Sequence, residues 1–377
     1  MKILLTSGGS GGHFYPLIAV AESINAIAKK ENLLSAQIFF MSDNPYDAEA
    51  LVENNITFIP ISAGKMRRYF SILNFFDFFR TISGVISALI KVFKLYPDVI
   101  FSKGAYASFP VLVAARLLRI PIIIHESDSV PGRTNLWAGK FAQKIAVSYP
   151  DTAKYFEDQE KIAFTGNPLR KAVLNRNNKD GSCEYLNLEK NLPTILIIGG
   201  SLGAQLINER ILDALPKLVE KYQIIHQTGK NNVGEISRTA EIILADNPNK
   251  NRYRIFDYLN DLTLTMAAGA ADLVVSRAGS TIFEIASWGL PSIVIPITES
   301  NGNHQRLNAY TYARSGAALV IEEANLTTNI LVEEIDRILQ DKNLKEKMSE
   351  AAKNFARLDA ADKIAREIIN IALTHEE

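Results

Sequence analysis

The sequence predicts an α/β protein with two doubly wound parallel sheets, and three observations support this fold class. Short β-branched runs alternate with longer helical patterns along the chain, which is typical of parallel sheets with crossover helices. The chain has 377 residues, more than one ordinary core holds, so we expect two domains. A strand, a glycine-rich turn and a helix follow one another at residues 3–12 and again at residues 194–203. The repeated unit indicates two Rossmann-like domains.

The predicted strands share a short run of apolar, mostly β-branched residues bounded by polar or turn residues. They are residues 2–6, 37–41, 98–102, 120–125 and 144–147 in the first half, and 194–198, 223–227, 253–256, 273–276 and 292–296 in the second. Helices are expected between them, for example at 16–30 and 204–215, and again over 339–374. The polar stretch 175–191 is interpreted as a surface excursion.

The domain boundary is expected near the turn at residues 165–168. We therefore predict a first domain over residues 1–164 and a second over residues 165–353. The last helix, about 354–377, is expected to pack back on the first domain.

Composition excludes several classes of protein. Lys plus Arg equals Asp plus Glu, 41 against 41, so the chain lacks the basic excess of most nucleic-acid binders. The one cysteine, Cys183, excludes an intrachain disulfide and a four-thiolate zinc site, and fits a reducing compartment. The apolar run at residues 1–7 is too short for a signal peptide, and residues 69–95 contain too many charges for a membrane span.

Both glycine-rich turns suit an anionic ligand. Glycines let the backbone approach a ligand closely, and the N-terminus of the following helix offers N–H groups to an anion. Neither turn has the dinucleotide spacing G-x-G-x-x-G, and no Gly-Lys-Ser/Thr follows either one, which argues against a nicotinamide oxidoreductase and a P-loop enzyme. The alternative is a tight turn needed only for helix–sheet packing.

His13 stands at the end of the first turn, where a helix begins. A helix N-terminus disfavours imidazolium, so a neutral imidazole there can accept a proton as a general base. The alternative is a packed or capping histidine.

The order of motifs resembles the MurG family, the N-acetylglucosaminyltransferases of peptidoglycan synthesis, nearly end to end. The motifs are Gly8-Gly9-Ser10-Gly11-Gly12-His13, Gly64-Lys65-Met66-Arg67-Arg68-Tyr69, His125-Glu126-Ser127-Asp128, Gly166-Asn167-Pro168-Leu169-Arg170, Gly199-Gly200-Ser201-Leu202-Gly203-Ala204, Ser276-Arg277-Ala278-Gly279-Ser280-Thr281 with Glu284, and His304-Gln305.

The resemblance implies the GT-B fold, two Rossmann-like domains with a cleft between them. It also implies transfer of GlcNAc from UDP-GlcNAc to the 4-hydroxyl of the muramoyl sugar of lipid I, with inversion, giving lipid II and UDP. The family is not known to use a catalytic metal. The sequence agrees, because it has no Asp-x-Asp pair and no His/carboxylate cluster at metal-ligand spacing. We expect no cofactor.

The resemblance also implies site residues. His13 is the candidate base, and Glu126 is expected to orient it or to hold the acceptor. The residues expected to bind UDP-GlcNAc are Ser10, Gly11, Gly12, Asp128, Arg170, Ser201, Leu259, Gly279, Ser280, Thr281, Glu284 and Gln305. Within that set, Arg170 and Ser201 are expected at the diphosphate, the backbone of Leu259 at uracil, Glu284 at the ribose and Gln305 at the sugar hydroxyls.

The chain departs from the family pattern at a few positions. Asp128 replaces an amide that contacts the GlcNAc in the family, and an ionised carboxylate accepts hydrogen bonds but cannot donate them. Lys103 stands before Gly104-Ala105-Tyr106, where many relatives have an all-glycine approach. His304 stands where many relatives carry glutamine, and the stretch 276–284 is one residue shorter than the family's.

A basic and aromatic segment is expected to face a membrane. Arg67 and Arg68 precede Phe75, Phe76 and Phe79, and cations beside exposed aromatic rings suit an anionic lipid surface. We therefore expect peripheral binding at the cytoplasmic face of the cell membrane. The alternative is a core helix with charged ends.

Two other functions fit a fold of this kind. One is a different UDP-sugar enzyme, either a transferase with another acceptor or a UDP-GlcNAc epimerase. The other is a non-catalytic protein that binds a nucleotide sugar or a lipid. The release of UDP with and without a lipid acceptor distinguishes them.

Overall fold

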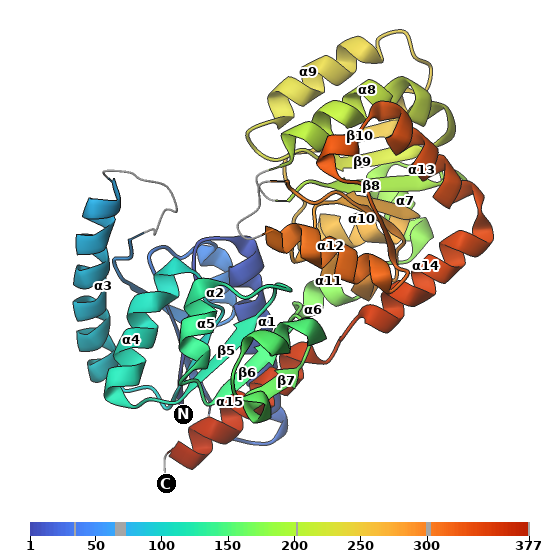
Figure 1. Cartoon of the computed structure of the whole chain (residues 1–377). Coiled ribbons are helices and arrows are strands. Elements are labelled where there is room, and N and C mark those ends of the chain that lie inside the picture. Colours follow the sequence, from blue (N-terminus) through green and yellow to red (C-terminus); the bar gives the residue numbers. More distant parts are fainter. Residues whose placement is uncertain (34, 65–72, 201–202, 299–302, 376–377) are drawn as a thin grey trace. The chain divides into compact units, whose positions relative to one another are not determined.

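The computed structural model describes residues 1–33, 35–64, 73–200, 203–298 and 303–375 (Figure 1). It divides into unit 1, formed by Met1–Arg170 with Arg357–Glu377, and unit 2, formed by Lys171–Ala356. The predicted boundaries at 164/165 and 353/354 lie a few residues before the observed changes of unit. Arg170, which we predicted to belong to the second domain, is therefore the last residue of the first segment of unit 1.

Unit 1 contains a seven-stranded parallel sheet in the order β3-β2-β1-β4-β5-β6-β7. Its strands are β1 (Lys2–Thr6), β2 (Gln37–Ser42), β3 (Ile56–Pro60), β4 (Val99–Ser102), β5 (Ile122–Glu126), β6 (Lys144–Val147) and β7 (Ile162–Phe164). Its helices are α1 (Gly11–Lys30), α2 (Ala48–Glu53), α3 (Leu73–Leu95), α4 (Phe109–Leu118), α5 (Arg133–Gly139) and α15 (Ala360–His375).

Unit 2 contains a six-stranded parallel sheet in the order β10-β9-β8-β11-β12-β13. Its strands are β8 (Thr194–Ile198), β9 (Gln223–Gln227), β10 (Tyr253–Phe256), β11 (Leu273–Ser276), β12 (Ser292–Val294) and β13 (Ala318–Val320). Its helices are α6 (Lys171–Leu174), α7 (Lys179–Leu186), α8 (Gln205–Lys221), α9 (Val233–Ile243), α10 (Asp261–Ala270), α11 (Thr281–Trp288), α12 (His304–Arg314), α13 (Thr328–Gln340) and α14 (Lys342–Phe355). The two parallel α/β sheets confirm the predicted fold class.

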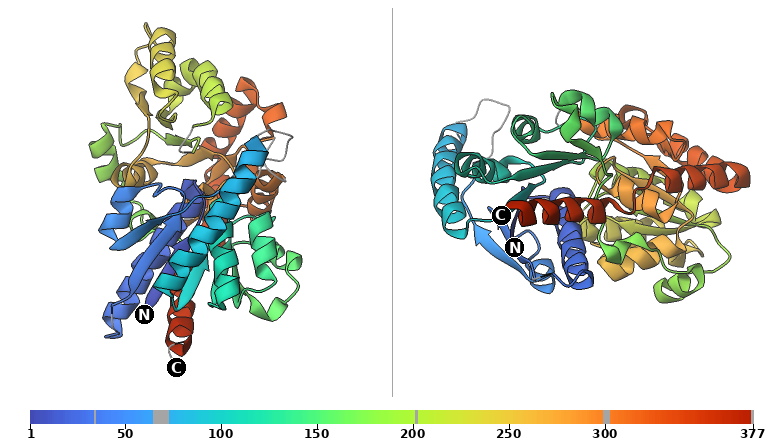
Figure 2. Two further views of the ribbon diagram at one scale, coloured as in Figure 1. Left: turned by 90° about the vertical axis from the view of Figure 1, so that its left-hand side faces the viewer. Right: turned by 90° about the horizontal axis from the view of Figure 1, so that it is seen from below.

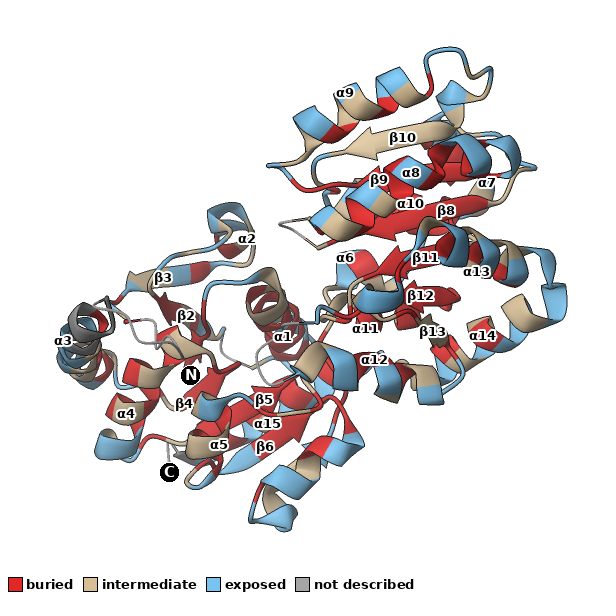
Figure 3. Ribbon diagram, turned by 45° about the horizontal axis from the view of Figure 1, so that its top comes forward, coloured by how far each residue is buried: buried red, intermediate tan, exposed pale blue. Residues whose placement is uncertain are grey.

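Burial explains why the strands read as continuous apolar runs. Strands covered by helices on both faces are apolar at most positions. In unit 2 the central strands β8, β9, β11 and β12 are buried along their length, whereas the edge strands β10 and β13 are only partly buried (Figure 3). The strands that sequence analysis missed, β3, β7 and β13, lie at or next to a sheet edge, where the apolar signal is weaker.

The last helix, α15, packs against α1 within unit 1. Ile364, Ala365 and Ile368 of α15 are buried in the same apolar cluster as Ile3 and Leu17. Burial of an Ile side chain contributes roughly 1.5–3 kcal/mol. An ion pair between Arg366 and Glu31, 2.8 Å apart, lies at the edge of the contact.

The polar stretch 175–191 is not a simple surface excursion, so that interpretation is wrong. It contains α7, which packs against α10 and buries Ser182 and Cys183 completely. A Cβ on Gly269 of α10 would lie 2.2 Å from the Ser182 hydroxyl, so a glycine is needed for the two helices to approach.

The long helix α3 lies beside α4 on the outside of unit 1 (Figure 2). Its large apolar side chains at 79, 82, 86, 90 and 93 are between 42% and 64% exposed. That spacing follows the helical repeat, so these residues form one partly exposed apolar stripe along α3. Among the described residues, no helix is both long and apolar enough to cross a bilayer.

Candidate active site

Each sheet has a point where its connections change direction. In unit 1 the chain passes from β1 outward through β2, but from β4 it proceeds the opposite way, so the loops after β1 and β4 diverge. Ligands of open α/β sheets usually bind at the carboxyl ends of such strands. Residues 7–13 follow β1 and residues 103–106 follow β4. In unit 2 the corresponding loops are residues 199–204 after β8 and residues 277–281 after β11.

The first glycine-rich turn leads directly into α1. The carbonyl of Ser10 accepts hydrogen bonds from the amides of His13 and Phe14, both at 3.0 Å, so the helix starts at Gly11. A Cβ on Gly11 would lie 2.8 Å from the Tyr46 hydroxyl oxygen, which leaves little room for a side chain. Gly11, Gly12 and His13 therefore form the first turn of α1, and His13 is half-buried there.

A buried polar cluster lies beside this turn. The ammonium nitrogen of Lys103 is 2.6 Å from Nδ1 of His125 and 3.3 Å from Oδ1 of Asn167. His125 Nε2 is 2.9 Å from the carbonyl of Gly166. A carbonyl only accepts, so Nε2 bears the proton and Nδ1 accepts from Lys103. Burial, together with the charge of Lys103, lowers the pKa of His125 well below its usual value, so this ring stays neutral.

Glu126, the last residue of β5, holds the loop that follows it. Its Oε1 accepts from the amide of Asp128 at 3.0 Å, and its Oε2 accepts from the amide of Gly132 at 3.0 Å and from Nδ2 of Asn135 at 2.9 Å. Gly132 is the N-cap of α5, so the carboxylate also caps that helix. Burial raises the pKa of Glu126, and the nearby Asp128 raises it further. Both oxygens of Glu126 are thus engaged by N–H donors of the segment that follows β5.

Asp128 lies within the loop that Glu126 holds. Its amide donates to Glu126, and its carbonyl accepts from the Thr152 hydroxyl at 3.0 Å. The residue is half-buried, so its carboxylate is partly accessible to solvent.

Arg170 contacts α1. Its guanidinium carbon lies 3.9 Å from the ring centroid of Tyr15, which is two residues after His13, and Tyr15 donates to Asp47 at 3.1 Å. The aromatic face orients the guanidinium by a cation–π contact. The guanidinium of Arg170 therefore lies beside the start of α1, which contains His13.

The second glycine-rich turn is built with tight backbone contacts. Gly200 and Gly203 have φ angles of +88° and +78°, a region that favours glycine. A Cβ on Gly203 would lie 2.1 Å from the carbonyl oxygen of Thr228. Ser201, expected at the diphosphate, lies outside the described residues, as do Arg67 and Arg68 of the expected membrane patch. Phe75 and Phe76 belong to α3, but their side chains are not described; Phe79 is 54% exposed.

Gln227, the last residue of β9, ties two loops of unit 2 together. Its Nε2 donates to the carbonyl of Gly200 and its Oε1 accepts from the amide of Leu259, both at 3.1 Å. The Leu259 amide, expected at uracil, is thus engaged by Gln227, which would have to turn for that amide to reach a base. Sequence analysis missed Gln227; the available signal was a pair of polar residues, His226 and Gln227, at the end of a predicted buried strand.

The turn after β11 starts α11. Ser280 precedes its first residue, Thr281, and Glu284 lies half-buried in the first turn. The carbonyl of Ala278 accepts from Asn308 of α12 at 3.2 Å. The guanidinium of Arg277 pairs with Glu323 at 2.7 Å and donates to the carbonyl of Ile295 at 3.1 Å.

Those contacts hold the start of the turn that leads to Gly279, Ser280 and Thr281, and β11 itself pairs with β8. Gln305, the second residue of α12, accepts a hydrogen bond from the amide of Ile297 at 3.2 Å. Unit 2 therefore gathers Gly199, Gly203, Gly279–Thr281, Leu259 and Gln305 near the carboxyl ends of its strands.

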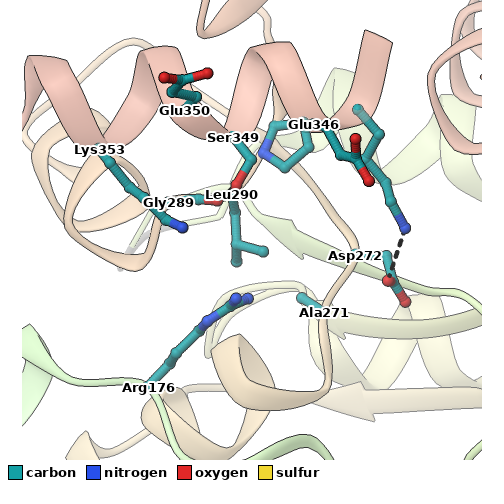
Figure 4. A pocket seen from close by; sticks show the side chains of 11 residues that line it. Arg176, Ala271, Asp272, Gly289, Leu290, Glu346, Ser349, Glu350 and Lys353 are labelled. Carbon is teal, nitrogen blue, oxygen red and sulfur yellow. Dashed lines mark hydrogen bonds and ion pairs between the residues drawn. The ribbon is translucent and has the colours of Figure 1, made fainter. Parts of the chain in front are cut away.

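A pocket of about 480 Å³ lies at the end of the unit 2 strands opposite to the glycine-rich turns. Asp272 and Pro291 in its lining directly precede β11 and β12, so it opens at the amino ends of these strands. Arg176 and Lys353 extend into it from facing walls, and Asp272 pairs with Lys345 at 3.2 Å (Figure 4). The pocket is distinct from the glycine-rich turns. Among the described residues, no group of three or more His, Cys, Asp or Glu could hold a metal ion.

Comparison with known proteins agrees with this arrangement. Residues 3–147 match the N-terminal domain of glycosyltransferase family 28, and residues 194–364 match its C-terminal domain. The solved structure of Acinetobacter baumannii MurG superposes with a TM-score of 0.73 at 26% identity, covering 98% of this chain and 99% of that one. UDP-GlcNAc 2-epimerase from Neisseria meningitidis has a TM-score of 0.69 at 15% identity, a likeness in fold alone.

The fold and the matched domains define the class: the protein is a glycosyltransferase of the GT-B fold with family 28 domains. Curated relatives named UDP-N-acetylglucosamine–N-acetylmuramyl-(pentapeptide) pyrophosphoryl-undecaprenol N-acetylglucosamine transferase specify it further. The Clostridium novyi relative is 35% identical over 94% of this chain and 95% of its own length. A Bacillus cereus relative, named as transferase 2, is 36% identical over 97% and 99%. The chain belongs to this family, the MurG transferases.

Proposed function

We propose that this protein transfers GlcNAc from UDP-GlcNAc to the 4-hydroxyl of the muramoyl sugar of lipid I, with inversion, giving lipid II and UDP for cell-wall synthesis. The observation that carries the proposal is the 35% identity to the Clostridium novyi transferase across nearly the full length of both chains. The site geometry adds a half-buried histidine in the first turn of α1, at the point where the unit 1 sheet changes direction.

His13 is the proposed general base. An inverting transfer is a single in-line displacement, and it needs a group that removes the proton of the acceptor hydroxyl. His13 suits that step because its side chain is ionisable and lies in the first turn of α1, just after the turn that follows β1. Glu126 is proposed to position Asp128 and α5 rather than to contact the acceptor, because both of its oxygens are engaged by N–H donors.

The unit 2 loops are proposed to bind the UDP part of the donor. Backbone N–H groups at the start of α8 and α11 stabilise the charge that develops on the departing diphosphate, as helix N-termini do for anions. Glu284 is proposed to accept from the ribose hydroxyls and Gln305 to contact the GlcNAc hydroxyls. Arg170 and Ser201 are proposed to reach the diphosphate, and Ser10, Gly11, Gly12 and Asp128 to contact the sugar nucleotide from unit 1.

The apolar stripe of α3 is proposed to bind the membrane that holds lipid I, at its cytoplasmic face. Phe79, Ile86 and Phe93 are each more than half exposed along the stripe. Arg80, Lys91 and Lys94 belong to the same helix. Cations near an anionic leaflet contribute about 1 kcal/mol each, and exposed apolar side chains enter the interface.

The direct test measures UDP release from UDP-GlcNAc in EDTA, with and without a soluble lipid I analogue. We expect release only with the analogue, and GlcNAc recovered on it. UDP release at the same rate with and without the analogue would contradict transferase activity. Binding of UDP-GlcNAc with no release in the presence of the analogue would reject lipid I as the acceptor.

A further inference from the structure

His226, in β9 of unit 2, is a fully buried histidine that belongs neither to the proposed base nor to the expected donor contacts. Its Nδ1 lies 2.9 Å from the hydroxyl oxygen of Tyr253 in β10, and its Nε2 lies 3.0 Å from Oδ1 of Asn208 in α8. Buried polar groups whose hydrogen bonds are all made hold their neighbours in one arrangement. His226 therefore connects β10 to α8.

A backbone carbonyl fixes the direction of these hydrogen bonds. Nδ2 of Asn208 lies 3.0 Å from the carbonyl oxygen of Thr228, which can only accept, so Asn208 donates there and presents Oδ1 to the ring. Nε2 of His226 must then bear a proton. Burial lowers the pKa of His226 to about 3, so the ring is neutral and Nδ1 accepts from the Tyr253 hydroxyl. The chain of donors runs from Tyr253 through His226 and Asn208 to Thr228.

The carbonyl of Thr228 is the point where this chain meets the second glycine-rich turn. The oxygen accepts a further hydrogen bond from Nδ2 of Asn232 at 3.0 Å. Gly203 lies directly against it, since a Cβ there would be 2.1 Å away. The amide of Gly203 in turn donates to the carbonyl of Gly200 at 3.0 Å. The position of the Thr228 oxygen therefore limits where the end of the turn can lie.

Asn208 also belongs to the helix that follows the turn. Its amide donates to the carbonyl of Ala204, the N-cap of α8, at 2.9 Å, while its side chain reaches Thr228 just after β9. One residue thus ties the first turn of α8 to the end of β9. The attraction of a helix N-terminus for an anion falls off within the first turn, so a small shift of these N–H groups weakens it.

We propose that His226 is a positioning residue for the donor, which acts through Asn208 and Thr228 to hold the second glycine-rich turn and the start of α8 where the diphosphate binds. The proposal rests on the proposed function for what this turn binds. A histidine that served only the stability of the core would change the unfolding midpoint without a selective loss of UDP affinity.

Two tyrosines near opposite ends of β9 give a matched test. Tyr253→Phe removes the donor to His226, and Tyr222→Phe removes a hydroxyl that donates to Asp336 at 2.6 Å, away from the turn. Each change deletes one hydrogen bond, so both should lower the unfolding midpoint. We expect the Kd of UDP to rise about three-fold in Tyr253→Phe and to stay unchanged in Tyr222→Phe, with kcat at saturating UDP-GlcNAc within about two-fold in both. An equal Kd in the two variants would overturn the proposal.

Substitution of the histidine itself should have a larger effect. His226→Leu removes both hydrogen bonds, and we expect the Kd of UDP to rise about ten-fold while kcat at saturating donor changes little. His226→Gln keeps an amide N–H that can donate to Asn208, so it should recover part of the affinity. A Kd in His226→Gln no better than in His226→Leu would contradict a role carried by the hydrogen bond to Asn208. If His226→Leu fails to fold, the two tyrosine variants still decide the matter.

The state of the ring can be read without any ligand. In a ¹⁵N spectrum of histidine-labelled protein, the ring signals of His226 are those lost in His226→Gln. We expect Nε2 to be protonated and Nδ1 to be unprotonated, with neither changing between pH 8 and about pH 5, because the pKa of the ring is low. A protonated Nδ1 would overturn the chain of donors. Natural protein that binds no UDP would refute the proposed function, while this spectrum would still test the hydrogen bonds of His226.

Discussion

The two sheets share one strand order up to the sixth strand, yet the points where they change direction contain different chemistry. In unit 1 the loops after β1, β4 and β5 bring together His13, Lys103, Glu126 and Asp128, all of them ionisable. In unit 2 the loops after β8, β9 and β11 present glycines and Ser280, with Gln227 at the end of β9, and their ionisable groups are the cations Lys230 and Arg277.

This difference suggests a division of labour. A cluster whose charges depend on one another suits a step in which a proton moves. A frame of backbone N–H groups suits an anion that must be held and then released as a leaving group. Variants of the ionisable cluster in unit 1 should therefore change turnover most, and variants of the glycine-rich turns in unit 2 should change donor binding most.

The largest effect is expected for His13→Ala. Removing a general base costs about 10²–10⁴ in rate. We expect kcat to fall by about 10³, with the dissociation constant of UDP-GlcNAc nearly unchanged because the UDP part of the donor is proposed to bind to unit 2. Steady-state kinetics and calorimetric titration check this. Equal turnover in the variant would remove His13 as the base, and a large loss of binding would break the division between the units.

Glu126→Gln should have the next largest effect. The amide cannot accept from all three N–H donors, and a buried unsatisfied donor costs about 1–3 kcal/mol, so we expect kcat/KM to fall by roughly ten-fold or more. Because the pKa of Glu126 is raised, this carboxylate takes up a proton as pH falls from neutrality, earlier than an ordinary glutamate.

The pH profile tests that assignment. The acid limb of log kcat/KM should approach a slope of about 2 in the natural protein, from Glu126 and the base, and about 1 in Glu126→Gln. The stability of the fold should depend on pH in the opposite direction to activity. A carboxyl group whose pKa is raised in the folded state contributes stability at acidic pH, and this contribution is lost as pH rises through the folded-state pKa. An identical acid limb in both proteins would show that Glu126 does not titrate with activity.

Gly203→Ala tests unit 2. The positive φ angle and the approach of the Thr228 carbonyl force the backbone to shift, at a cost of roughly 1–3 kcal/mol. We expect UDP affinity to fall about ten-fold while kcat at saturating donor changes little. Gly234→Ala is the matched control, because its Cβ meets no atom within 4 Å and alanine favours the helix α9. A kcat defect larger than the binding defect would contradict the comparison.

The smallest effect on chemistry is expected for Phe79→Ser combined with Ile86→Ser. These residues are 54% and 55% exposed on the α3 stripe. Binding to anionic vesicles should weaken about ten-fold, with unchanged activity on a soluble acceptor, since the stripe lies on an outer helix. Ile242→Ser, at a side chain 77% exposed in unit 2, should alter neither. Vesicle binding that survives the double change would exclude the stripe as the membrane contact.

Sequence predicted the fold well because its signal is local. Buried parallel strands such as β1, β8 and β11 are apolar at most positions, and their bounds agree with the prediction at 2–6, 194–198 and 273–276. The polar stretch 175–191 concealed α7, because a short helix that buries mainly Ser182 and Cys183 has little apolar periodicity.

The site was only partly accessible from the sequence. The motifs single out Glu126 and Lys103. They do not show that both carboxylate oxygens of Glu126 accept from N–H groups, or that the buried Lys103 contacts His125. Such facts depend on which loops the strand order brings together. Gln227 was missed for the same reason, since its two partners, Gly200 and Leu259, are distant in the sequence.

The course of the chain through unit 1 has a consequence for biosynthesis. Unit 2 is inserted between Arg170 and Arg357, and α15 then completes the core around α1. A ribosome therefore releases nearly all of unit 1 long before Ile364 and Ile368 exist to cover Ile3 and Leu17. During that interval the nascent first unit exposes an apolar face, and a truncation or bulky fusion at α15 would damage the half of the enzyme made first.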